Sequence, residues 1–396
     1  MSEWPTVRFE ELAAKEKSSF SKPYGSAYTR NDYVSAGVPL VRGINLGSGR
    51  FHDDDFVFIT PEKADTLPGA NLAAGDLVLT HRGTIGQVSM IPRNPKRDRY
   101  VLSTSQVKAR LDESRALPEF YFYWLISPAG QNEILQHVST VGVPGLVQPV
   151  ATVKSLKVPH PPMQEQRRIV AVLGALDDKI AVNERISTTA NELASALFQS
   201  CKKRPPRLIT EVATITMGQS PPGNTYNESG NGLPFYQGNR DFGIRYPGHR
   251  VWSTAVSRRA YRGDVLISVR APVGEVNVAS EECGIGRGVA AVRSEKYPHV
   301  TLYALSSDRS IWNPYEAEGT VFGAINKKQF AQLEISWPDS AQIDALEARL
   351  GALDDRLNQA EAESKALRTL RDTLLPQLMS GRLRVRDAEK IVEDHA

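Results

Sequence analysis

Two parts of this chain resemble each other, and this internal duplication constrains the fold more than any other feature of the sequence. The six residues Leu-Gly-Ala-Leu-Asp-Asp stand at 173–178 and again at 350–355. Two further matches lie upstream in the same order, 75–80 with 263–268 and 39–43 with 234–238. Collinear matches of this kind indicate a duplicated unit, and two copies are too few for a solenoid of stacked repeats. We therefore expect two similar folded parts.

The composition is that of a folded protein with no unusual partner. Hydrophobic residues make up 41% of the 396 residues, and 48 Lys and Arg against 45 Asp and Glu leave a net charge of +3, which argues against a polybasic phosphate binder. The two cysteines, Cys201 and Cys283, exclude a disulfide framework. The start has no signal-peptide pattern, and no run of about eighteen apolar residues could span a bilayer. A cytoplasmic protein without membrane contact is expected.

Each half begins with a segment rich in Gly, Pro, Val, Ile and aromatic residues, in which short β-like runs are broken by turn signals. This pattern predicts a globule of mixed α/β (α+β) structure, expected at 1–160 and at 204–338. Within the first globule, Pro118 is placed to open a helix. The aromatic run 120–124 is expected to pack in the core of that globule rather than to stack on nucleic-acid bases.

A different pattern follows each globule, in which Gly and Pro nearly vanish and apolar residues recur every seven positions. It predicts long helices with one narrow apolar seam, typical of a coiled coil. The helices are expected at 161–203 and 339–381, ending at Gly381, and a tail at 382–396 is either flexible or packed on the first globule. The predicted seam residues are Ile169, Leu173, Leu176, Ile180 and Asn183 in the first helix, and Leu346, Leu350, Leu353, Leu357 and Leu367 in the second.

Chain order predicts that the two long helices run antiparallel, about a pseudo-twofold axis. The first helix carries the chain from one globule to the other, and the second has to return along a matching seam. A helix of about 39 residues is about 58 Å long, which is longer than one globule of this size requires. Asn183, a polar residue in the seam, is expected to fix the helix register at some cost in stability. The alternative is that each helix lies independently on its own globule.

The junctions between globules and helices are similar to those of a known family. Pro161-Pro162-Met163-Gln164-Glu165-Gln166-Arg167-Arg168-Ile169 at the entry to the first helix and Leu374-Leu375-Pro376-Gln377-Leu378-Met379-Ser380-Gly381 at the exit from the second resemble the specificity subunits of type I restriction–modification systems. The segments 269–274 and 286–289 resemble a pattern in the target-recognition domains of that family. The second junction, 338–343, departs from the family by lacking a Glu-Gln pair.

The resemblance implies a role in prokaryotic defence. Each globule would be a target-recognition domain that binds one half of a split, asymmetric sequence in double-stranded DNA, and the helical pair would set the spacer between the halves. Two modification subunits, which bind S-adenosylmethionine and methylate adenine, would dock on the helices. Restriction subunits with translocase and nuclease activity would complete the complex. The chain itself would hold no cofactor, metal or catalytic residue.

Polar residues at equivalent turns and strand ends are the candidate DNA contacts, because Arg and Lys suit phosphate and guanine whereas Asn and Gln suit adenine. Glycines beside Arg287 would let the backbone approach a phosphate. The alternative for the matching Arg82 and Arg270 is a buried salt bridge that holds the fold. The candidates are Arg42, Asn45, His81, Arg82 and Thr84 in the first globule, and Gln237, Asn239, Arg240, Arg270 and Arg287 in the second.

The sequence also bears on two other kinds of protein. An adenine methyltransferase or a nuclease is disfavoured, because Asn313-Pro314-Tyr315 lacks the second proline of a base-holding loop and no phosphate-binding loop or metal-binding histidine spacing occurs. A protein adaptor, with two globules on a coiled coil but no DNA, is left open by the composition. Basic and amide side chains on a common face, with salt-sensitive binding, would favour the DNA-binding protein over the adaptor.

Overall fold

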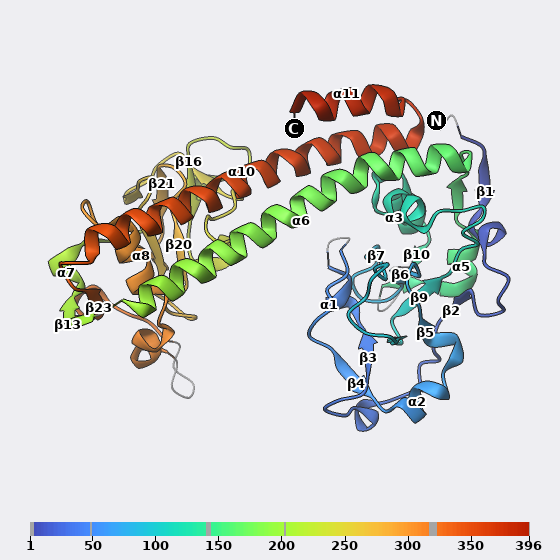
Figure 1. The fold of residues 1–396 in the computed structure, drawn as a ribbon, viewed down its shortest axis with the longest axis horizontal. Coiled ribbons are helices and arrows are strands. Elements are labelled where there is room, and N and C mark those ends of the chain that lie inside the picture. Colours follow the sequence, from blue (N-terminus) through green and yellow to red (C-terminus); the bar gives the residue numbers. More distant parts are fainter. Residues whose placement is uncertain (1–3, 48–49, 140–143, 202, 317–322, 396) are drawn as a thin grey trace. The chain divides into compact units, whose positions relative to one another are not determined.

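A computed structural model describes residues 4–47, 50–139, 144–201, 203–316 and 323–395 of the chain. The chain divides into two units, Met1–Ala181 together with Ser364–Ala396, and Val182–Glu363. Each unit combines one β-rich globule with part of two long helices, α6 (Met163–Ser200) and α10 (Ile343–Ser380) (Figure 1). The predicted fold class, mixed α/β with two similar globules and two long helices, is confirmed.

Among the residues that the structure describes, the first globule contains two four-stranded sheets and two small two-stranded ones. One four-stranded sheet has the order β2 (Phe20–Ser21), β9 (Gln106–Ala109), β6 (Leu77–Thr80), β7 (Val88–Met90). The other has the order β4 (Val57–Ile59), β3 (Val38–Val41), β8 (Tyr100–Leu102), β5 (Asn71–Leu72). The two-stranded sheets pair β1 (Thr6–Arg8) with β12 (Lys157–Pro159) and β10 (Val138–Ser139) with β11 (Gly145–Leu146). Its helices are α1 (Gly43–Leu46), α2 (Pro61–Asp65), α3 (Pro118–Ile126), α4 (Pro128–Leu135) and α5 (Pro149–Ser155).

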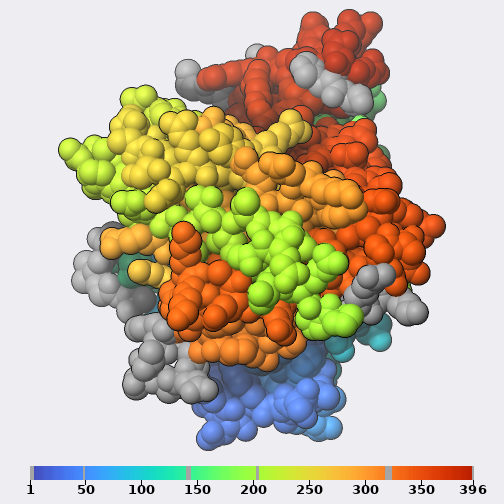
Figure 2. Space-filling view, turned by 90° about the vertical axis from the view of Figure 1, so that its left-hand side faces the viewer, coloured from blue at the N-terminus to red at the C-terminus, as the bar shows by residue number. Residues whose placement is uncertain are grey.

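The second globule repeats this arrangement. One sheet has the order β14 (Thr214–Met217), β22 (Val289–Arg293), β19 (Val265–Ser268), β20 (Val276–Val278). The next has the order β15 (Tyr226–Asn227), β17 (Trp252–Ser253), β16 (Leu233–Tyr236), β21 (Cys283–Ile285), β18 (Arg259–Ala260). A two-stranded sheet pairs β13 (Lys203–Leu208) with β23 (Glu334–Pro338). Its helices are α7 (Ile209–Val212), α8 (Pro298–Ser306) and α9 (Lys327–Ala331). Figure 2 shows this globule, yellow to light orange, beside deeper orange residues of α10.

The large sheets of the two globules share a common strand order, to which the second globule adds β15. The order β2, β9, β6, β7 in the first matches β14, β22, β19, β20 in the second, and in each globule the other large sheet contains one parallel pair. That pair is β3 with β8 in the first globule, where Leu40 lies opposite Val101, and β16 with β21 in the second, where Phe235 lies opposite Gly284. The duplication predicted from the sequence therefore extends to the topology and register of the sheets.

The apolar seams of α6 and α10 are buried. In the first unit, Leu173 of α6 and Leu374 and Leu378 of α10 join one core cluster with the globule. In the second unit, Ala194 of α6 and Leu350 of α10 do the same. Of the predicted seam residues Leu353 is partly buried and the other nine are buried, so their side chains face the helix pair and the globules rather than solvent.

A repeated aspartate joins each globule to its stretch of the helices. In the first unit, Asp177 of α6 accepts a hydrogen bond of 2.7 Å from the Tyr123 hydroxyl of α3 and pairs at 2.7 Å with Arg371 of α10. Asp177 is the first aspartate of the repeated Leu-Gly-Ala-Leu-Asp-Asp segment. This carboxylate thus connects three helices, and the antiparallel course of α6 and α10 supplies its arginine.

The equivalent aspartate of the second unit, Asp354 of α10, has a different set of partners. It accepts a hydrogen bond of 3.0 Å from Tyr303 of α8, which corresponds to Tyr123, and pairs at 2.9 Å with the buried Arg245 of the globule. His299 Nδ1 lies 2.8 Å from its second oxygen, and that hydrogen bond raises the pKa of the imidazole. Within the same stretch of the helices, the Asn183 side chain donates to Glu363 at 2.9 Å.

Helix α3 and the C-terminal tail are both anchored in the first unit by apolar contacts. The aromatic helix α3 buries Phe120, Tyr121 and Trp124, which confirms that the run packs in the core. Helix α10 ends before Gly381, whose φ of +74° suits glycine. The tail forms α11 (Val385–His395), and its Val385 and Ala388 are buried in the core cluster of the first unit. The tail therefore packs within the first unit, in a cluster that also contains Leu378 and Met379 of α10, and Figure 1 draws α11 beside α10 rather than on the sheets of the first globule.

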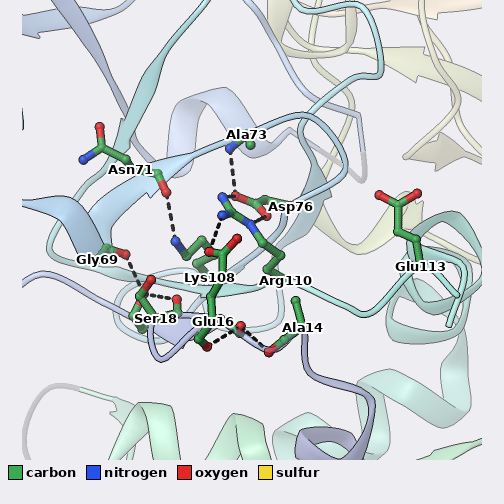
Figure 3. A network of polar contacts seen from close by, with 12 residues as sticks. Ala14, Glu16, Ser18, Gly69, Asn71, Ala73, Asp76, Lys108, Arg110 and Glu113 are labelled. Atoms are coloured by element: carbon green, nitrogen blue, oxygen red, sulfur yellow. Dashed lines mark hydrogen bonds and ion pairs between the residues drawn. The ribbon is translucent and has the colours of Figure 1, made fainter. Parts of the chain in front are cut away.

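Buried acid–arginine pairs hold the large sheets at the repeated Gly-Asp turn. Asp76, with 1% of its side chain exposed, binds Arg110 through both oxygens, each at 2.7 Å (Figure 3). Asp264 and Arg293 repeat this geometry at 2.7 and 2.9 Å. Beside the first pair, the buried Lys108 donates to the Asn71 carbonyl at 2.9 Å, and burial lowers its pKa.

Replacing Asp76 with alanine should lower the free energy of unfolding by about 3 kcal/mol, because the partly buried Arg110 loses its bidentate partner. Urea unfolding of the full chain measures this change. The control is Asp65→Ala, which removes a carboxylate that is 69% exposed and paired with Arg99 and should cost less than about 1 kcal/mol. Equal losses in the two variants would contradict a special role for the buried pair.

Candidate nucleic-acid interface

One edge of each globule is built on the same set of backbone hydrogen bonds. In the first globule, Ser103 N–H donates to the Val41 carbonyl and His81 N–H donates to the Ser105 carbonyl, both at 2.9 Å. In the second, Gly286 N–H donates to Tyr236 and Val269 N–H to Gly288, also at 2.9 Å. We call these the first and second recognition edges, formed by residues 42–44, 82–87 and 103–105, and by residues 237–240, 270–275 and 286–288.

The first recognition edge brings together three of the predicted residues. Arg42 follows β3, Arg82 and Thr84 follow β6, and the three line one open hollow of about 540 Å³. Arg82 and Thr84 are exposed, and Arg42 is partly buried. The Arg42 Nη2 donates to the Asp55 carbonyl at 3.1 Å, which holds the guanidinium in place. A cationic, hydrogen-bonding hollow of this kind is suited to an anionic, polar ligand such as nucleic acid.

Two predicted residues of the first globule lie beneath the surface instead. Asn45 is 1% exposed, and its side chain accepts a hydrogen bond from Arg42 N–H and donates to the carbonyls of His52 and Asp54. Its amide is therefore occupied in holding the loop after β3. His81 is also buried, 3.1 Å from the Thr104 carbonyl, and burial lowers the pKa of its imidazole. Neither side chain is placed to meet DNA, because both are enclosed by the loops that they support.

The second recognition edge places Gln237 beside Arg287. The Gln237 Oε1 accepts a hydrogen bond of 2.9 Å from the Ser220 hydroxyl, whose oxygen lies 3.3 Å from Arg287 N. Both side chains are exposed. A Cβ at Gly286 would lie 2.4 Å from Gln237 Oε1. The glycine beside Arg287 therefore makes room for the glutamine side chain, which is a different reason from the phosphate approach expected from the sequence.

The remaining predicted residues of the second globule lie along the same edge. Asn239, in the turn after β16, is partly buried, and Arg240 is exposed. Arg270 follows β19, is exposed, and forms a backbone bridge with Ala324 that matches the bridge between Arg82 and Gly145. The alternative of a buried salt bridge for Arg82 and Arg270 is wrong, since both are exposed and neither forms an ion pair with another described residue. Buried aspartates instead pair with other arginines, Asp76 with Arg110, Asp264 with Arg293 and Asp354 with Arg245.

The edges also contain residues that the sequence did not single out. Ile44, 62% exposed, and Gln87 share the hollow with Arg42 and Arg82. Thr104 occupies the place that Arg287 has in the second globule, because each is the middle residue of the turn that leads into the last long strand of its sheet. Extending the repeat alignment through this turn would have found Thr104. The exposure of Ile44 has no signal in the sequence, since apolar residues are usually buried.

Among the residues that the structure describes, no group of three or more His, Cys, Asp and Glu side chains is arranged to hold a metal ion. No described helix has the length and apolar character needed to cross a membrane.

Comparison with known proteins agrees with the geometry. Residues 1–192 match the family model described as the type I restriction modification DNA specificity domain. A relative from Methanocaldococcus jannaschii, which has the provisional name type I restriction enzyme MjaX specificity subunit, is 27% identical over 377 residues and 88% of each chain. The type I restriction enzyme HindI specificity subunit of Haemophilus influenzae is 33% identical over 107 residues, which are 26% of this chain and 22% of that one.

The fold has also been seen before. The crystal structure of a type I restriction–modification system S subunit from M. genitalium is similar to this chain with a TM-score of 0.59 and 15% identity, over 95% of this chain and 96% of that one. At this identity the likeness concerns the fold alone, which includes the pairing of two globules with long helices. The family model over residues 1–192 and the relative along 88% of the chain support the assignment of this chain to the specificity subunits of type I restriction–modification systems.

Proposed function

We propose that the chain directs a type I restriction–modification complex to a bipartite, asymmetric DNA sequence, with one half bound by each globule. The observation that carries this proposal is the pair of recognition edges, which share a backbone hydrogen-bond pattern but present different side chains. Equal scaffolds with unequal side chains are suited to two DNA half-sites of equal geometry and unequal sequence.

The residues common to both edges and those that differ have different roles in this proposal. Arg82 and Arg270 are exposed at equivalent positions, so they would bind the phosphate backbone, which is the same in every sequence. Arg42, Thr84 and Thr104 in the first edge, and Gln237, Asn239, Arg240 and Arg287 in the second, would lie toward the base edges. Asn45 and His81 are left out, since they are buried.

The long helices would set the spacer and bind two methyltransferase subunits. The seam residues are buried, so a partner would contact the outward faces of the helices. Two large apolar residues of α6, Val182 and Leu193, are 50% and 48% exposed there. The partners would carry S-adenosylmethionine and methylate adenine in the cytoplasm, and restriction subunits would cleave DNA. The chain itself would supply no catalytic residue.

Deletion of this chain should abolish a split methylation motif. We expect it to co-purify with proteins encoded beside it, and sequencing of methylated adenines in cells carrying the set should reveal a bipartite, asymmetric motif. A strain that lacks only this chain is the control and should lose the motif. Absence of both a methyltransferase partner and a motif would overturn the proposed function and favour a protein adaptor.

Removing a shared arginine should weaken DNA binding without changing the sequence preference. For Arg270→Ala in the assembled complex, we expect the slope of log binding constant against log salt concentration to decrease by about one, the value for one phosphate contact. The midpoint of unfolding should be unchanged, because Arg270 is exposed. Titration of DNA at several salt concentrations measures the slope. The control, Arg207→Ala, removes the same charge at an exposed position of β13 and should leave binding unchanged. Lower stability with unchanged affinity would show a structural role.

Lengthening both helices should lengthen the spacer. Seven residues inserted after Ala181 and seven after Glu363, at the boundary between the two units, keep the seam period and add about 10 Å of helix. We expect the methylation motif to gain about three base pairs of spacer. The control is a seven-residue insertion after Gly230, in an exposed loop. A motif with an unchanged spacer in the helix variant would exclude the helices as the measuring element.

A further inference from the structure

In each globule, the residue directly after the first strand of the parallel pair occupies an equivalent position. Val41 and Tyr236 end the strands β3 and β16, and each accepts the matching hydrogen bond from the turn opposite, at 2.9 Å. The next residue is Arg42 in the first globule and Gln237 in the second. Because the carbonyl before each residue is held in the same way, the two side chains leave their globules from the same point of the scaffold.

Arg42 is held ready for a ligand with two acceptors. Its Nη2 donates one hydrogen to the Asp55 carbonyl at 3.1 Å. The second hydrogen of Nη2 and those of Nη1 have no partner among the described residues. The side chain lines the same hollow as Arg82 and Thr84. An arginine fixed through one nitrogen is preorganised to donate two parallel hydrogen bonds, as the O6 and N7 atoms of guanine require.

Gln237 is held ready for a ligand with one donor and one acceptor. Its Oε1 accepts from the Ser220 hydroxyl at 2.9 Å and lies against Gly286. A carbonyl oxygen has a second lone pair, and Nε2 has no partner among the described residues. The free lone pair and the free N–H groups match the N6 and N7 atoms of adenine, to which a glutamine binds through both atoms of its amide.

We propose that position 42 in the first globule and position 237 in the second are equivalent specificity-determining positions, with Arg42 selecting a guanine and Gln237 an adenine. This inference rests on the proposed function, since it assigns bases within the two half-sites. It makes the motif asymmetric at a defined pair of positions.

A reciprocal exchange tests the assignment. The variants Arg42→Gln and Gln237→Arg are produced in the full complex with its methyltransferase, separately and together, and methylated adenines are mapped in cells. We expect Arg42→Gln to change one guanine to adenine in one half of the motif, and Gln237→Arg to change one adenine to guanine in the other half. The preference at each changed position should shift by about 5- to 150-fold.

Three controls separate base selection from other effects. Arg207→Gln makes the same chemical change at an exposed arginine on another sheet and should leave the motif intact. Arg42→Lys keeps a donor suited to guanine and should keep the guanine. The half of the motif that a variant does not touch reports its folding, and Gln237→Arg, at an exposed residue, tests the inference even if Arg42→Gln does not fold.

Different results would contradict this inference and the proposed function. An unchanged motif that is methylated more weakly at every site would mean that Arg42 or Gln237 binds phosphate or supports the loop, and would overturn the inference alone. Both variants altering the same half would also overturn it. Absence of any bipartite motif with the unaltered chain would instead overturn the proposed function.

Discussion

Burial of the apolar seams of α6 and α10 is the constraint on which the rest of the structure depends. Each core cluster contains residues of both long helices, Leu173 with Leu374 in the first unit and Ala194 with Leu350 in the second. The first unit is therefore discontinuous in sequence, because it is completed only when the chain returns through α10. The hydrophobic effect in this way forces an antiparallel helix pair on a chain whose two halves are copies.

A repeated aspartate then attaches each globule to that pair. Asp354 is buried and Asp177 is partly buried, so each carboxylate is paired with a cation. A hydroxyl from the adjoining helix also binds each copy, from Tyr123 and from Tyr303. The arginine differs, since Arg371 comes from a long helix whereas Arg245 comes from the globule. Both attachments therefore use the repeated aspartate, whereas the arginine that pairs with it comes from a different element in each unit.

The recognition edges show the same division at the surface. The same backbone hydrogen bonds fix the turns in both globules, so an exposed side chain there can differ between the globules without losing these bonds. Arg42 and Gln237 have diverged at one such point, while Arg82 and Arg270 have remained the same. A duplicated scaffold of this kind allows one chain to present two different hydrogen-bonding surfaces in equal positions.

The sequence by itself determined the duplication, the class of fold, the two helices and their seams, because repeats and periodicity are visible along the chain. It also identified four candidate DNA contacts that the structure places at the surface, Arg82, Arg270, Gln237 and Arg287. Only the tertiary structure decided that Asn45 and His81 support loops, that Ile44 is exposed, and that Asp177 and Asp354 bind tyrosines. Burial and pairing of a polar side chain depend on which distant segments cover it, and spacing along the chain carries no record of those neighbours.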